Sequence, residues 1–420
     1  MKKRILFLLV VLMYSCGTGS KAPSTSKIST YKKEVNSIHP QFAVFHVNDS
    51  LSELHYKIAS KELLYTRPDA INFSSNVLIS YRLVKSYDSK DILDSSSVRL
   101  VDENNANADK YLVGKINIKA LYTKSYYLKI TVTDLNRNTS ASSVIVVEKD
   151  NELNRQNFII KSKEDDIPLF RNYLKMGEEV SIQYKQKKES SVFVRYYNRD
   201  FPLAAPPFSL TEPKPFQYKS DSTFVLKMSK EGHFDFTLNK KGFYHFQLDT
   251  TKRDGLTVYN FTDAFPEVKN ADGMLLPLRY ITSRDEFTAI ANSVNRKAAV
   301  EKFWLDCTGN MDRAKEVIRK FYTRVNDANS HFSSYIEGWK TDRGLIYLIY
   351  GSPGTIYRTA NTETWIYGEV NSINSLQYTF VRVNNPFTEN DFSLERSAIY
   401  RQSWYMAVDV WRQGRAYLQD

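Results

Sequence analysis

The chain has 420 residues and a mass of 48.7 kDa, more than one hydrophobic core usually serves, which predicts two or three domains. Hydrophobic residues make up 42% of the sequence and aromatic residues 14%, enough for packed interiors. The net charge is +11, and the basic residues are spread along the chain and not gathered into runs. This pattern is typical of a solvated basic surface and argues against nucleic-acid binding. Anionic lipid or acidic partners remain open.

The first residues have the layout of an export signal. A basic head, Lys2-Lys3-Arg4, is followed by the apolar run Ile5–Met13, which is too short for a spanning helix of about 20 residues. Residues 1–15 are therefore predicted to be a signal peptide. The segment Leu12–Cys16 resembles the bacterial lipobox, and this resemblance implies a diacylated thiol at Cys16. The alternative is an ordinary cleaved signal with an incidental cysteine.

The sequence contains two cysteines, Cys16 and Cys307. If Cys16 carries lipid, Cys307 has no partner for an intrachain disulfide. Cys307 follows Phe303-Trp304-Leu305 in a helical pattern, which predicts a small buried apolar residue and not a reactive thiol. A Cys16–Cys307 disulfide is the alternative.

Residues 16–38 are predicted to be a lipidated, flexible tether. Residues 17–30 are rich in Ser, Thr, Lys and Gly and contain no Asp or Glu. Lipoproteins that reach the cell surface in Bacteroidota resemble one another in carrying acidic residues after the lipidated cysteine, and these are missing here. An Asp directly after the cysteine, which favours inner-membrane retention, is missing as well. We therefore expect the periplasmic face of the outer membrane, with the cell surface as the alternative.

Residues 39–150 are predicted to form a first β-sandwich. Apolar residues alternate with other residues along two segments, as in half-buried antiparallel strands. These residues are Val77, Ile79, Tyr81 and Leu83, and then Tyr126, Leu128, Ile130 and Val132. The polar turn at residues 134–138 precedes a further apolar run. Two late strands around such a turn suggest an immunoglobulin-like sandwich.

Residues 151–264 are predicted to form a second sandwich of the same kind. Strand faces are expected at Val180–Tyr184, Val192–Tyr196 and Phe224–Met228. Tyr244, just after Gly242, is placed as a corner tyrosine. Five of the 13 prolines lie between Pro202 and Pro215, and because proline cannot donate to a central ladder, this segment is expected to be a long loop or edge connection.

Residues 265–420 are predicted to be an α+β domain. Ser283 and Glu286 fit a capping box at a helix start. Apolar residues from Ala314 to Val325 follow helical spacing and form one core stripe. The run Leu345–Tyr350, ending in Gly351-Ser352-Pro353-Gly354, is interpreted as a strand, and two more strands are expected at residues 365–367 and 376–383. Tyr400, Trp404, Val408 and Trp411 predict a closing helix.

The segment from Glu337 to Gly344, with the sequence EGWKTDRG, resembles the signature of the GWxTD domain, found in predicted lipoproteins of Bacteroidota. Further matching motifs precede and follow it, so that the resemblance covers roughly residues 275–415. These motifs are Lys302–Leu305, Tyr322–Asn329, Tyr350–Gly354, Glu363–Tyr367 and Asn385–Thr388. The family has no established activity to carry over, and the resemblance therefore implies lineage and architecture but no reaction.

The signature can be interpreted structurally or as a ligand or interaction site. Thr341 and Asp342 can bond backbone amides and set a turn into the expected strand. Arg343 can pair with a carboxylate in bidentate fashion, and Trp339 can bury its ring with its N–H partnered. Gly338, with Gly344, can adopt backbone angles closed to other residues. The structural interpretation is favoured.

The sequence lacks the usual catalytic patterns, including His-Glu-x-x-His, paired cysteine ligands and a phosphate loop. Six scattered histidines show no ligand spacing, although two of them could meet across strands, namely His233 and His245. No cofactor or metal site is therefore expected. A hydrolase hypothesis remains, in which Glu337, Asp342 and Glu363 act as acid and base across a cleft.

The leading hypothesis is a non-catalytic, lipid-anchored component of an outer-membrane assembly, secretion or envelope complex, with an envelope protein as partner. The alternative is a ligand-binding lipoprotein whose sandwiches hold glycan on exposed aromatic residues. Clusters of Trp and Tyr on a flat sheet face would favour this alternative. Only five tryptophans exist, and three of them, Trp304, Trp404 and Trp411, fit helix core stripes.

Overall fold

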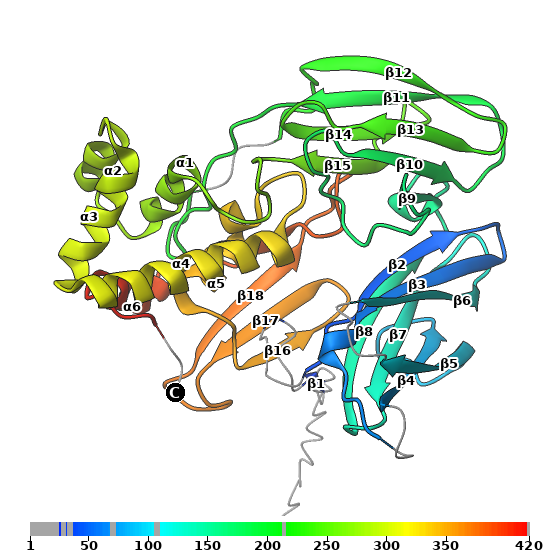
Figure 1. Ribbon diagram of the computed structural model, residues 1–420, viewed down its shortest axis with the longest axis horizontal. Coiled ribbons are helices and arrows are strands. Elements are labelled where there is room, and N and C mark those ends of the chain that lie inside the picture. Colours follow the sequence, from blue (N-terminus) through cyan, green and yellow to red (C-terminus); the bar gives the residue numbers. More distant parts are fainter. Residues whose placement is uncertain are drawn as a thin grey trace, which may run out of the picture.

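The computed structural model describes residues 25–26, 31, 37–67, 73–104, 110–211 and 216–417. The expected signal peptide and Cys16 lie outside these residues. The fold is mainly β, with sheets in the first two thirds of the chain and helices with a further sheet in the last third, which confirms the predicted fold class. Figure 1 shows two sheet bodies at one side and the helices α1–α3 gathered at the other.

Sandwich 1 consists of a three-stranded sheet that packs on a four-stranded sheet. The first sheet has the order β2-β3-β6 and the second β5-β4-β7-β8, with all neighbours antiparallel. The elements are β2 (Gln41–His46), β3 (Leu51–Ala59), η1 (Ser60–Glu62), β4 (Phe73–Val84), β5 (Ile92–Asn104), β6 (Tyr111–Lys119), β7 (Ser125–Asp134) and β8 (Thr139–Glu148). The alternating apolar residues of β4 and β7 are all buried, as their period of two predicts.

Sandwich 2 repeats this architecture with the sheet orders β13-β10-β9 and β12-β11-β14-β15. The elements are η2 (Arg155–Asn157), β9 (Phe158–Ser162), β10 (Glu179–Tyr184), β11 (Ser190–Tyr197), β12 (Ser222–Met228), β13 (His233–Thr237), β14 (Gly242–Gln247) and β15 (Leu256–Asn260). The proline-rich segment between β11 and β12 contains no strand among its described residues, 198–211 and 216–221. We call residues 198–221 the proline-rich loop.

Each sandwich has a tyrosine corner, in which a strand tyrosine bonds a carbonyl a few residues upstream. The Tyr244 hydroxyl donates to the Lys240 carbonyl at 3.2 Å, so the predicted corner is confirmed. In sandwich 1 the Tyr126 hydroxyl donates to the Leu121 carbonyl, also at 3.2 Å. The turn before β7 and the turn before β14 are therefore held in the same way.

The C-terminal domain packs helices on a five-stranded antiparallel sheet with the order β1-β16-β17-β18-β19. Its strands are β1 (Thr25–Ser26), β16 (Thr355–Arg358), β17 (Thr362–Tyr367), β18 (Leu376–Arg382) and β19 (Phe392–Leu394). Its helices are α1 (Ala271–Leu275), η3 (Leu276–Tyr280), α2 (Arg284–Ala291), α3 (Arg296–Thr308), α4 (Met311–Phe332), η4 (Gly338–Lys340), α5 (Asp342–Tyr350) and α6 (Tyr400–Arg412). The long helix α4 runs past the sheet in Figure 1.

The run Leu345–Tyr350 is helical and not a strand, so that prediction was wrong. All of its residues are buried, and a continuous apolar run of this length cannot be assigned to helix or strand from its periodicity. The residues at the ends decide the outcome. The Thr341 hydroxyl accepts the Gly344 amide at 3.0 Å as the N-cap, and Gly351 at φ +84° ends the helix.

The other helix predictions hold. Ser283 and Glu286 form the predicted capping box, with Ser283 N donating to Glu286 at 2.7 Å. The stripe from Ala314 to Val325 and the tryptophans of α3 and α6 share one core. In that core Trp304, Phe321 and Trp411 contact one another edge to face.

An aromatic cluster joins sandwich 2 to the C-terminal domain. Tyr197 and Phe243 of sandwich 2 stack with ring centroids 4.5 Å apart. Phe387, from the C-terminal domain, lies 5.1 Å from Phe243 and 5.2 Å from Phe216 of the proline-rich loop. Tyr335 completes the contact 5.3 Å from Phe201. We call these residues the interdomain aromatic cluster, and such rings supply much of the apolar area at an interface.

The chain begins, in its described part, on the C-terminal domain. β1 pairs antiparallel with β16, with Thr25 opposite Tyr357 and Ser26 opposite Ile356. Tyr31 is 9% exposed and belongs to the core of the C-terminal domain, whereas Ile38 is buried in the core of sandwich 1. The segment expected to be a flexible tether therefore contains residues held by two different modules.

Candidate functional site

The signature residues connect the end of α4 to α5 through the short helix η4. Thr341 joins the two helical pieces, because its hydroxyl donates to the Gly338 carbonyl at 2.7 Å while it accepts the Gly344 amide. The predicted turn of Thr341 and Asp342 therefore exists as a helix cap, and it leads into α5 instead of a strand. This connection positions every other side chain of the signature.

The two glycines of the signature serve close packing and not unusual backbone angles. Neither is among the glycines with positive φ, so that part of the prediction was wrong. A β-carbon on Gly338 would lie 1.9 Å from the Ala328 carbonyl oxygen, and one on Gly344 would lie 1.9 Å from the Gly338 carbonyl oxygen. The backbones of α4, η4 and α5 thus approach one another as closely as only glycine permits.

Trp339 is 2% exposed and packs its ring edge to face on Tyr280 at 6.0 Å. Its indole N–H donates to Glu337 Oε1 at 3.4 Å, as the expected partnered N–H requires. Glu337 also forms an ion pair with Lys340, whose ammonium group lies 5.4 Å from the indole ring centre. The carboxylate of Glu337 is therefore engaged by two neighbours within the signature.

Asp342 fastens α5 to the strand β19 and to the segment that follows it. Arg396 contacts both Asp342 oxygens, with Nη1 3.0 Å from Oδ2, and the Leu394 amide donates to Oδ2 at 2.7 Å. This is the bidentate geometry that strengthens a guanidinium–carboxylate pair. Arg396 donates as well to the Ala205 carbonyl of the proline-rich loop at 3.2 Å. The Ala204 amide of that loop donates to Lys340 O at 3.1 Å.

Arg343 is 3% exposed and lies 4.1 Å from the ring centre of Phe392. It pairs with a carboxylate, as predicted, but through one nitrogen, because Nη1 lies 3.5 Å from Glu363 Oε2. Nη2 instead donates to the carbonyl of Asn390 at 3.0 Å and to its side chain. Arg343 therefore divides its donors between β17 and the loop before β19.

Glu363 is the centre of a buried charge network. Arg358 Nε donates to Oε1 at 2.9 Å, and the Trp365 indole donates to Oε2 at 3.1 Å. Burial by itself would raise the pKa of Glu363, but Arg358 and Arg343 lower it to about 2. The Tyr31 hydroxyl donates to both oxygens at 3.1 Å. Glu363 therefore stays ionised, with Arg358, Trp365 and Tyr31 as hydrogen-bond donors and Arg343 as an ion-pair partner.

The carboxylates of the hydrolase hypothesis do not converge on a shared partner. Glu337 pairs with Lys340, Asp342 with Arg396, and Glu363 with Arg358 and Arg343. A catalytic acid of this type needs a carboxyl group whose pKa is raised. The pKa of Glu363 moves in the opposite direction. The geometry therefore gives each of these three residues its own structural partner.

The histidines lie apart. His233 is on β13 and His245 on β14, which belong to opposite sheets of sandwich 2, so they do not meet across paired strands. His245 bonds Thr257 Oγ1 and the Arg253 carbonyl, each at 2.8 Å, and burial lowers its pKa to about 4. Among the described residues, no three His, Cys, Asp or Glu side chains are grouped as metal ligands would be.

Every tryptophan is buried, which bears on the glycan hypothesis. All five are at most 4% exposed, so none presents a flat face to a sugar. Cys307 is half-buried against the helical core, and burial raises its pKa to about 11, which makes it a poor nucleophile.

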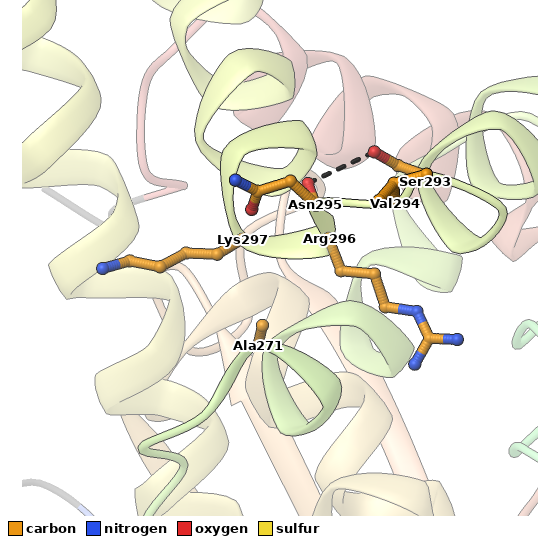
Figure 2. A pocket seen from close by; sticks show the side chains of 6 residues that line it. All are labelled: Ala271, Ser293, Val294, Asn295, Arg296 and Lys297. Atoms are coloured by element: carbon orange, nitrogen blue, oxygen red, sulfur yellow. Dashed lines mark hydrogen bonds between the residues drawn. The ribbon is translucent and has the colours of Figure 1, made fainter.

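Two surface hollows lie on the helices. One, of about 740 Å³, is lined by Ala271 and residues 293–297, and in Figure 2 the side chains of Arg296 and Lys297 point to opposite sides. The second, of about 460 Å³, lies between α2, α3 and α6 beside Cys307. The carboxylate of Glu286 there is bound by Arg412, with both contacts at 2.8 Å, and this bonding lowers the pKa of Glu286 to about 2.

Sequence reasoning found the signature but missed most of its partners. It did not place Arg396, Arg358 or Asn390, because nothing local marks them. Tyr31 carried one usable signal, since it is the only aromatic residue among residues 17–41. A lone aromatic side chain in a polar segment is a candidate for docking elsewhere.

Comparison with known proteins identifies the C-terminal part. Residues 242–413 match the family model of the GWxTD domain, and the chain therefore carries this domain, as the signature predicts. The match begins at β14 and includes the last two strands of sandwich 2. No curated protein matches the chain.

Among solved structures, the chain is similar to alpha-2-macroglobulin of Escherichia coli activated by porcine elastase, at 14% identity and a TM-score of 0.12. That alignment covers 50% of this chain and 21% of the other. In the part of the chain that the structure describes, no helix combines the length and apolarity that crossing a bilayer requires.

Proposed function

We propose that this protein is a non-catalytic interaction component of the bacterial envelope, anchored by lipid at Cys16 to the periplasmic face of the outer membrane. The observation that carries the proposal is the use of the signature charges. Within the signature, Glu337 binds Lys340, Asp342 binds Arg396 and Arg343 binds Glu363, all inside the fold. A site built in this way holds modules in place.

The contacts between the modules support a role as a scaffold. The signature is covered by the proline-rich loop of sandwich 2, through the Ala204–Lys340 and Arg396–Ala205 hydrogen bonds. The interdomain aromatic cluster adds an apolar contact between the same two modules. A protein whose modules are fixed to one another can present partners with surfaces at defined positions.

The anchor part of the proposal rests on the basic head, the short apolar run and the lipobox-like ending at Cys16. Metabolic labelling with palmitate is expected to label the wild-type chain, whereas the Cys16→Ser variant stays unlabelled. An unlabelled wild-type chain, or one recovered from the cytosol, would contradict the anchor.

The interaction part is tested by crosslinking intact envelopes and purifying the protein under denaturing conditions. We expect a specific outer-membrane or other envelope protein to be recovered with the wild-type chain. The Cys16→Ser variant is the matched control, because it keeps every folded module and loses only the proposed anchor. Recovery of the wild-type chain as an uncrosslinked monomer from several growth conditions would contradict the proposal.

A further inference from the structure

We propose that the edge of β16 and the pocket around Glu363 form a binding site for a tyrosine-bearing peptide segment, and that the chain's own strand β1 and Tyr31 are its resident ligand. We call this pocket the Tyr31 socket. It is formed by His331, Phe332, Arg358, Glu363 and Trp365.

The segment binds as a peptide ligand binds a sheet edge. β1 supplies backbone pairing to β16, and Tyr31 supplies one side chain that enters a pocket. Backbone pairing gives such a complex affinity without regard to sequence, and the pocket gives it specificity. Tyr31 and Glu363 are 332 positions apart, so the socket is complete without any residue near Tyr31 in sequence.

The socket recognises both parts of a tyrosine side chain. The ring of Tyr31 lies 5.0 Å from the ring of Phe332 and 5.4 Å from the ring of Trp365. The guanidinium group of Arg358 lies 5.4 Å from the centre of the Tyr31 ring. The hydroxyl donates to both oxygens of Glu363. Phenylalanine would fill the space but offer no donor, and a phosphorylated tyrosine would bring negative charge against Glu363.

The socket does not depend on its ligand for charge balance. If Tyr31 leaves, Glu363 keeps the donors of Arg358 and Trp365 and its ion pair with Arg343. The carboxylate of Glu363 is then still paired. Loss of a buried partner is most costly when it leaves a buried charge unpaired, and that does not happen here. The pocket can therefore exist with and without the segment.

The docked segment also connects modules. Seven positions separate Tyr31 in the C-terminal domain from Ile38 in the core of sandwich 1, a reach of at most about 25 Å. If Cys16 carries the lipid of the proposed function, the nine positions to Thr25 keep β16 within about 32 Å of the anchor. The site itself does not rest on that anchor, and its test contains no membrane.

The test uses a fluorescent peptide of residues 22–36 and two forms of the otherwise full chain, the wild type and Tyr31→Ala. In the wild type the resident segment competes at an effective concentration of the order of millimolar, so the added peptide binds weakly. We expect the Tyr31→Ala chain to bind the peptide at least tenfold more tightly. Hydrogen exchange should show renewed protection of Thr355–Arg358 in that complex.

Peptide variants provide the controls without altering the protein. A peptide carrying Tyr31→Ala should lose binding, one carrying Tyr31→Phe should bind more weakly, and one phosphorylated at Tyr31 should not bind. Equal affinity of all four peptides, or no binding to a folded Tyr31→Ala chain, would overturn the proposal. Loss of the folded C-terminal domain in Tyr31→Ala would overturn it too, because the socket would then not persist without its tyrosine.

Discussion

Gly344 packs directly on the carbonyl group of Gly338, so closely that a β-carbon on Gly344 would lie 1.9 Å from that oxygen. The two glycines bracket the signature, and the carbonyl of Gly338 also accepts the hydroxyl of Thr341 at 2.7 Å. The spacing between the glycines is therefore set by the contact of η4 with α5. This contact explains the signature as a packing motif.

Gly344→Ala is expected to destabilise the protein by more than about 4 kcal/mol, because the obstructing atom is backbone and cannot move aside. Denaturant unfolding measures the effect. Gly273→Ala is the matched control, since it also adds a β-carbon within a helix but meets side chains of Asn270 and Val268 at 3.1 and 3.2 Å. The control should change stability by less than about 1 kcal/mol. Equal effects of the two substitutions would contradict the packing explanation.

Tyr126→Phe and Tyr244→Phe should each cost about 1 kcal/mol, because each removes one hydrogen bond to a turn carbonyl. The two sites lie in different sandwiches, so the losses should add in the double variant. Thermal unfolding provides the measurement, with the exposed Tyr405→Phe as the control. A double variant as stable as the wild type would show that the corners do not hold the sandwiches.

Phe387→Ala is expected to cost about 3–5 kcal/mol, since Phe387 is 6% exposed and contacts Phe243 of sandwich 2 and Tyr335 of the C-terminal domain. The loss falls on the contact between sandwich 2 and the C-terminal domain, so calorimetry should show their unfolding separating into two transitions. Phe193→Ala, on the half-exposed face of β11, is the control and should leave the profile unchanged. A single transition at a merely lower temperature would mean that the cluster does not couple the modules.

Glu148 is expected to make stability fall as pH rises from about 4.5 to 7. Burial, and then the nearby carboxylate of Glu389, raise the pKa of Glu148 to about 7. A folded-state pKa above the unfolded value means that the native state holds the proton more tightly than the unfolded state. The stabilisation from the bound proton is therefore complete below about pH 4.5 and is lost as the pH rises through about 7. Glu148→Gln should remove this loss and stabilise the protein by about 1–2 kcal/mol at pH 8, discounted for partial exposure.

The measurement is the difference between variant and wild type across pH 4–8. Wild type alone is ambiguous, because burial lowers the pKa of His46 and His245 to about 4. A lowered histidine pKa acts with the opposite sign, since its stabilisation is present above about 6.5 and lost as pH falls. A difference that does not depend on pH would exclude Glu148 as the titrating group.

The sequence allowed the fold class to be predicted because alternation is a strong local signal. The strands β4 and β7 have an unbroken period of two over eight or more residues, and the packing follows from it. The same criterion failed at Leu345–Tyr350, where both faces are buried and no period exists. Helix caps at Thr341 and Gly351 carried the information there, and caps are short signals that an apolar run easily obscures.

The signature could be located from the sequence, but its chemistry could not be assigned. Asp342 and Arg343 bind groups 52 and 47 positions away, at Leu394 and Asn390. Contacts of that separation depend on the fold and leave no local pattern. The same limit applies to Tyr31. Composition placed Tyr31 in a flexible tether, because the pocket that binds it is formed by residues 331–365, far away in the sequence.

The most direct test of a structural, non-catalytic signature is Asp342→Asn. This substitution removes the ion pair with Arg396 while keeping the side-chain shape, and it should cost about 1–3 kcal/mol of stability. Melting temperature and crosslinked partner recovery are measured together, with recovery measured well below the melting temperature. We predict a lower melting temperature and unchanged recovery per folded molecule. An unchanged melting temperature with loss of the protein's function in cells would contradict it.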